Sequence, residues 1–140
     1  MAAWPQDAID GLTLRSRDAV LIFTRDPKLD VPAVQAALST QAGYIGAVGS
    51  RRTTVDRNPR LVQAGVSEED LERLYAPCGL DIGSSTVEET AAAILAEIIA
   101  QRAGREGSSL RGGSGPIGRE REQSGELLAR RASADEVPAG

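Results

Sequence analysis

The chain has 140 residues, a net charge of -4 at pH 7, one cysteine and no histidine. Acidic residues outnumber basic ones and the arginines are dispersed, which argues against nucleic acid as a partner. Without histidine, and with a single cysteine, the chain cannot build a Ser-His-Asp triad, a Cys-His dyad, an intrachain disulfide or a His/Cys metal cage.

The N-terminal segment, residues 1–17, is expected to be a lead-in to the folded part. Its first ten residues, MAAWPQDAID, contain no basic region followed by an apolar core, so they do not resemble a secretory signal. No stretch of the chain has the roughly 18 to 20 apolar residues of a membrane span. We therefore expect a cytoplasmic protein that does not enter a membrane.

Residues 18–24, DAVLIFT, form an unbroken apolar run, which is typical of a strand covered on both faces in a parallel sheet. The following segment predicts a helix with Asp30 as its N-cap and Gly43 as its C-cap. Residues 44–48 are again short and apolar. Connections this short favour a right-handed parallel crossover, so we predict a βαβ unit.

Two further helices are predicted after the second strand. Ser50 is expected to cap a helix that begins at Arg51, and Pro59 is expected to interrupt it because proline removes a backbone donor. Ser67 opens a capping box before a second, short helix.

Residues 76–85, APCGLDIGSS, are expected to form a loop or a weak strand. Thr86 and Glu89 make a capping box at the start of the last helix. Its apolar stripe is predicted to contain Ile94, Leu95, Ile98 and Ile99.

Residues 103–140 are rich in Gly, Ser, Arg and Glu, and they are expected to be a disordered tail because they can bury little apolar surface. The folded part is then residues 18–102. We predict an α/β fold, an incomplete Rossmann-like half-domain with a short parallel sheet and flanking helices.

An anion site is predicted where the second strand ends. Ligands of open α/β sheets lie beyond the carboxyl ends of the strands, and a helix N-terminus there offers free N–H groups. Gly49 allows close backbone approach, Ser50 caps the helix or donates to the ligand, and Arg51 and Arg52 add guanidinium groups. The alternative is ordinary helix punctuation with solvated arginines.

Other candidate binding residues lie in nearby loops. Asp26 and Lys28 follow the first strand, although a simple Asp-Pro turn also explains them. Gly79, Asp81 and Gly83 are candidates for the same cleft, although a glycine-rich connector explains them nearly as well. Neither a catalytic residue nor a metal ligand is assigned.

Four segments together resemble the C-terminal half of the XdhC/CoxI family over roughly residues 18–102. In chain order they are LIFTRDPKLDVPAVQAAL, YIGAVGSRRT, GVSEEDLERLYAPCGLDIG and TVEETAAAILAEIIA. The resemblance implies a Rossmann-like fold and a role as an accessory protein that matures molybdenum hydroxylases of the xanthine dehydrogenase or carbon monoxide dehydrogenase type. It also implies binding of the molybdenum cofactor, as molybdopterin or its dinucleotide form, and delivery to the apoenzyme.

Two other functions stay open. The chain could be half of an NAD(P)-dependent oxidoreductase, although none of its predicted strands leads into a glycine fingerprint. It could also be a non-catalytic fragment that acts only as a dimerisation module.

Half of a doubly wound sheet would leave residues 19–23 at an open edge, which invites pairing because no Pro or Lys blunts it. We therefore predict association, either as a homodimer or with a separate chain that carries the first Rossmann half.

Overall fold

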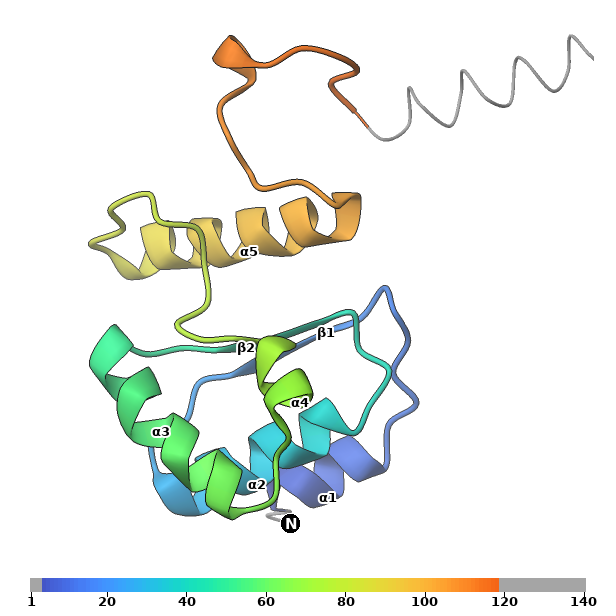
Figure 1. Cartoon of the computed structure of the whole chain (residues 1–140), viewed down its shortest axis with the longest axis vertical. Coiled ribbons are helices and arrows are strands. Elements are labelled where there is room, and N and C mark those ends of the chain that lie inside the picture. The colour runs from blue at the N-terminus through green and yellow to red at the C-terminus, as the bar shows by residue number, and fades with distance from the viewer. Residues whose placement is uncertain (1–3, 119–140) are drawn as a thin grey trace, which may run out of the picture. The chain divides into compact units, whose positions relative to one another are not determined.

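The computed structural model describes residues 4–118 of the chain. Residues 4–107 belong to one compact unit, and residue 108 begins a second. Figure 1 shows the course of the chain. The elements of the first unit are α1 (Pro5–Asp10), β1 (Ala19–Ile22), α2 (Pro27–Leu38), β2 (Tyr44–Ala47), α3 (Arg51–Gln63), α4 (Glu68–Glu72), β3 (Leu74–Tyr75) and α5 (Val87–Ala103).

The sheet is parallel, with the strand order β1-β2-β3. Ala19 pairs with Tyr44 and Ile22 with Ala47, so β1 and β2 end at the same level. All four residues of β2 are buried. The predicted α/β fold with a parallel βαβ unit is confirmed, and both strands are slightly shorter than predicted.

Helices cover both faces of this sheet. Figure 1 shows α1, α2 and α3 on one face and α5 on the other. The main core lies on the first face, where Val34, Ala37 and Leu38 of α2 pack with Ile22 and Ile45. Ile9 of α1 also packs against this core, so the predicted lead-in contributes a helix that the sequence did not suggest.

The predicted caps of α2 are wrong. Asp26 is the N-cap and its side chain accepts a hydrogen bond from the Lys28 amide, while Pro27 takes the first helical position. The helix ends at Leu38 with Ser39 as C-cap. Gly43 instead allows a close backbone approach, because a Cβ there would collide with the Ser16 carbonyl.

The predicted break at Pro59 is also wrong, because α3 runs without interruption to Gln63. Proline at this position lacks the N–H that would bond the Val55 carbonyl four residues earlier. Val55 is exposed, so water can satisfy that carbonyl. Arg57 and Leu61 are buried on the opposite side and hold the helix on the core. Tertiary packing therefore outweighs the local cost of the proline.

A buried ion pair joins α2 to α3. Arg57 and Asp30 are 2% and 4% exposed, and Arg57 Nε donates to Asp30 Oδ2 at 2.5 Å. Arg57 Nη2 also approaches the Val48 carbonyl at 3.4 Å. Within residues 4–118, Asp30 Oδ1 and Arg57 Nη1 have no hydrogen-bond partner. The pair thus ties the segment after β2 to the first turn of α2.

The predicted N-caps of α4 and α5 are confirmed. Ser67 accepts from the Asp70 amide, and Thr86 accepts from the Glu89 amide. The Glu89 carboxylate does not complete a reciprocal capping box but accepts from the Ser85 hydroxyl. Gly104 ends α5 in the left-handed conformation with φ of 68°.

The second unit is described as far as residue 118 and contains a short 3-10 helix, η1 (Leu110–Gly112). The remainder of the predicted tail, residues 119–140, lies outside the described residues. In the part of the chain that the structure describes, none of the helices is both long enough and apolar enough for a membrane crossing.

Replacing Arg57 by Met is expected to lower the free energy of unfolding by about 3–5 kcal/mol, because Asp30 would remain as an uncompensated buried charge. Urea unfolding measures the loss. Arg60→Met on the exposed side of the same helix is the control and should change stability by less than about 0.5 kcal/mol. An equally small effect of Arg57→Met would show that the pair does not hold α2 and α3 together.

Candidate functional site at the ends of the strands

The starts of α2 and α3 meet at one edge of the sheet. β1 and β2 are parallel and in register, and each is followed by a helix whose first turn lies beyond the strand's carboxyl end. Ligands of open α/β sheets bind at this edge. The geometry therefore brings the loops after both strands to the place where the sequence predicts a site.

The start of α3 has the features of an anion site. Ser50 accepts from the Thr53 amide, so it caps the helix as predicted. Gly49 has φ of 156°, which residues with a side chain rarely adopt, and a Cβ there would lie 3.1 Å from Thr53 Cβ. Arg51 and Arg52 are exposed, and the first turn contains no acidic residue. The positive end of the helix is thus reinforced by two cations and opposed by no carboxylate of its own turn.

The start of α2 is different. The Asp26 carboxylate accepts from the Lys28 amide as the N-cap, and the Asp26 amide donates to the Thr24 hydroxyl, so both groups already have partners within the chain. Lys28 is exposed one residue into the helix. The Asp-Pro turn explains both residues, and their role in ligand binding stays a prediction.

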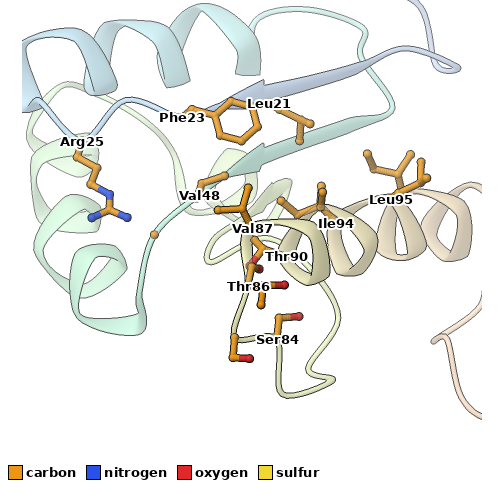
Figure 2. Close-up of a pocket in the computed structure, with 14 residues that line it drawn as sticks. Leu21, Phe23, Arg25, Val48, Ser84, Thr86, Val87, Thr90, Ile94 and Leu95 are labelled. Carbon is orange, nitrogen blue, oxygen red and sulfur yellow. The ribbon is translucent and has the colours of Figure 1, made fainter.

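A cavity of about 590 Å³ opens between the sheet and α5. Figure 2 shows its walls: Leu21, Phe23 and Val48 lie on the sheet side, and Val87, Ile94 and Leu95 lie on α5. The volume lies within the usual range for small-molecule sites, which is about 300–1,000 Å³. The cavity is lined by Leu21, Phe23, Arg25, Val48, Gly49, Ser84, Ser85, Thr86, Val87, Thr90, Ala91, Ile94, Leu95 and Ile98.

The cavity is polar at its margins and apolar at its centre. Arg25 and Gly49 border it at the strand ends, and hydroxyl groups of Ser84, Ser85 and Thr90 border it near the start of α5. Such a site suits a ligand with a flat or apolar body and an anionic group. The anionic group fits better near Gly49, because the first turn of α5 carries Glu88 and Glu89.

The predicted residues are only partly brought together. Gly49 lines the cavity, and Ser50, Arg51 and Arg52 follow it directly at the start of α3. The lining residues of α5 and the 84–86 loop were not predicted as site residues, because their pattern is equally typical of a capped core helix. The exposed position of Leu95, on a stripe expected to be buried, is the structural sign of the cavity.

Gly79, Asp81 and Gly83 lie outside the cavity lining. The Gly79 amide donates to Glu97 Oε1 at 3.0 Å, and its φ of 109° lets the loop pass close to Ala93 of α5. Asp81 and Gly83 are exposed. The loop has a clear role in holding α5, and ligand binding by these three residues stays a prediction.

Glu97 connects α5 to the sheet. Its Oε1 accepts from the Tyr44 hydroxyl at 2.6 Å as well as from Gly79. Tyr44 is buried and stacks on Tyr75 with ring centroids 4.7 Å apart. Burial, and then the hydrogen bond to Glu97, raises the pKa of Tyr44, so the phenol stays protonated. This contact fixes α5 over β2.

Cys78 lies next to this contact and is half-buried. Burial, and to a smaller extent the Glu97 carboxylate, raises the pKa of its thiol above the ordinary value. Since the thiolate is the nucleophilic form, the environment disfavours sulfur chemistry at this residue. Residues 4–118 contain no cluster of three or more His, Cys, Asp or Glu side chains that could hold a metal ion.

The fold corresponds to one half of a Rossmann-type α/β protein. This follows from the strand order, from the helices on both faces of the sheet and from the candidate site at the strand ends. The XdhC Rossmann domain matches residues 2–98, so the chain belongs to that family. The resemblance seen in the four sequence segments is thereby confirmed.

Three similar proteins put this membership in context. The molybdenum cofactor insertion chaperone PaoD of Escherichia coli K12 is 32% identical over 91 residues, which are 65% of this chain and 29% of that protein. The uncharacterized protein YqeB of the same organism is 35% identical over 92 residues, 66% of this chain and 17% of its own length. A crystal structure described as a xanthine dehydrogenase of Bacillus halodurans superposes on this chain with a TM-score of 0.58 at 31% sequence identity. The match covers 79% of this chain and 31% of the Bacillus halodurans chain. The chain therefore spans less than a third of each of these relatives.

Alkylation of Cys78 by iodoacetamide is expected to be slow at neutral pH in the folded chain. The alkylation rate should rise with pH, and the apparent pKa of this rise should be higher than for the same cysteine in the urea-unfolded chain, because burial disfavours the thiolate. Mass spectrometry of the modified peptide at a series of pH values measures both. A lower pKa in the folded chain would identify Cys78 as an activated thiol.

Proposed function

We propose that the chain is a cytoplasmic accessory protein that binds the molybdenum cofactor and assists its insertion into a molybdenum hydroxylase of the xanthine dehydrogenase or carbon monoxide dehydrogenase type. It acts by binding, without turnover. Family membership and the relative named as a molybdenum cofactor insertion chaperone support the class of function. The client apoenzyme and association through β1, with a second copy or a separate chain, belong to the same proposal.

One observation carries the proposal: an apolar cavity borders Gly49, directly before the cationic start of α3. The cofactor combines a flat pterin with a phosphate group. The apolar lining beside Gly49, which includes Val48 and Ala91, suits the pterin, and the start of α3 with Arg51 and Arg52 suits the phosphate. Arg25 at the margin adds a further cation.

The residues around the cavity fit a carrier better than a catalyst. The chain contains no histidine, and the pKa of its cysteine is raised by burial. A site without an activated acid, base or nucleophile can hold the cofactor and shield it from water. Installation of sulfur on the cofactor is then the task of another protein.

The alternative ligand is NAD(P), which many Rossmann-type proteins bind. A stretch of the form GxGxxG, GSGPIG, does occur at residues 113–118. The dinucleotide fingerprint requires a strand before the glycines and a helix after them. Here the glycines follow the 3-10 helix η1, so this stretch does not meet the requirement.

Anaerobic titration with isolated molybdenum cofactor is expected to give saturable binding, and NADH in a parallel titration is expected to bind much more weakly. Replacing Arg51 and Arg52 together by Ala should weaken cofactor binding by about tenfold or more, since hydrogen bonds between charged groups contribute about 1.5–3 kcal/mol each. Fluorescence of the pterin measures the affinity.

Arg60→Ala, an exposed arginine near the other end of α3, is the control and should leave the affinity unchanged. Tighter binding of NADH than of the cofactor would contradict the proposal. If the double variant and the unchanged chain bind the cofactor with equal affinity, the start of α3 is not part of the binding site.

A further inference from the structure

Strand β1 has an open hydrogen-bonding edge. In the described part of the chain it pairs with β2 alone. The carbonyls of Asp18 and Ile22 accept from the amides of Gly43 and Val48, so the backbone groups of the alternate residue Leu21 face away from β2. The strand contains neither proline nor lysine, the residues that commonly protect such an edge.

An apolar groove lies beside this edge. We call it the β1–α5 groove and define it by Leu21, Phe23, Val87, Ile94, Leu95 and Ile98, all of which line the cavity. Phe23 is 65% exposed, Val87 82% and Leu95 59%. Contiguous exposed apolar side chains of this kind mark an interaction surface.

The edge and the groove form one surface, because Leu21 contributes its side chain to the groove and its backbone to the edge. The opposite face of β1 is already covered, since Val20 and Ile22 pack against the core beneath α2. Parallel sheets are normally covered on both faces. A strand added to β1 would pair the open edge, and a helix following it and lying beside α5 would cover the exposed face of β1.

The strand order indicates what kind of segment fits. A complete Rossmann sheet has the order 3-2-1-4-5-6, so the first strands of its two halves are neighbours at the centre and run parallel. Here the order is β1-β2-β3, which is one half with its first strand at the edge. The position next to β1 is thus the one that the first strand of another half would take.

We propose that the β1–α5 groove binds a different polypeptide that carries the complementary βαβ half, whose first strand pairs parallel to β1 and whose first helix packs against Phe23 and Leu95. The interacting segment is a short apolar strand followed by a helix with an apolar face. The relatives contain ample polypeptide of their own beyond the matched region, because the chain spans 29% of PaoD and 31% of the solved Bacillus halodurans protein.

A second copy of the chain fits this edge poorly. A two-fold pairing would place the two β1 strands antiparallel, whereas the first strands of the two halves of a complete Rossmann sheet run parallel. The first strand of another half can enter parallel to β1, so the strand order favours a different chain over a second copy.

Co-expression of the chain with the part of PaoD outside the 91 matched residues tests the proposal. Native mass spectrometry of the purified material is expected to show a 1:1 complex. Phe23→Asp should weaken the complex by about tenfold or more, because a carboxylate would be placed against apolar surface. Both Phe23 and Leu95 are mostly exposed in the chain alone, so Leu95→Asp is a second variant that should fold and give the same result.

Val55→Asp is the matched control, because Val55 is exposed to a similar extent on α3, away from the groove. It should leave the complex intact, and circular dichroism should show that all three variants are folded. Absence of a complex, a complex that Phe23→Asp and Leu95→Asp do not weaken, or a homodimer of the chain that Phe23→Asp dissociates would each overturn the proposal.

Discussion

The need of a parallel sheet to be covered on both faces determines most of this structure. β2 meets it completely, since α2 and α3 lie on one side and α5 crosses the other, tied down by Tyr44 and Glu97. β1 meets it on one face only. The same incomplete cover creates the cavity, because Phe23 stays 65% exposed and lines it together with Leu21. The candidate ligand site and the proposed partner surface are therefore consequences of one structural fact, and they share residues.

For the proposed cofactor carrier, these shared residues have a mechanistic consequence. A second half bound beside β1 would cover the apolar part of the cavity, while the start of α3 with Arg51 and Arg52 would remain at its margin. Burial of the walls would strengthen the electrostatic attraction of the anionic group, because charges interact more strongly away from water. The Arg57–Asp30 pair stabilises this margin of the cavity, because Arg57 also donates to the Val48 carbonyl and so holds the segment after β2 in place.

The sequence was sufficient for β1, β2, the helices α2 to α5 and the caps Ser50, Ser67 and Thr86, because these depend on local patterns of apolar and capping residues, but it predicted neither α1 nor β3. The prediction that Asp30 is an N-cap was wrong, because its carboxylate instead forms an ion pair with Arg57, 27 residues further along the chain. Sequence reasoning also failed at Pro59, where packing of Arg57 and Leu61 outweighs a local rule. The walls contributed by α5 could not be predicted, because Ile94 is buried and Leu95 exposed on what reads as one stripe.

Amide hydrogen exchange of the chain alone, at low micromolar concentration, tests most directly whether β1 is an uncompleted edge. The comparison is between Leu21, whose amide faces the open side, and Ile45 at the centre of the sheet. The account predicts that Leu21 exchanges far faster than Ile45, because its amide has no strand partner in the chain. Equal and strong protection of both amides in the dilute chain would contradict it, since β1 would then be paired without any partner half.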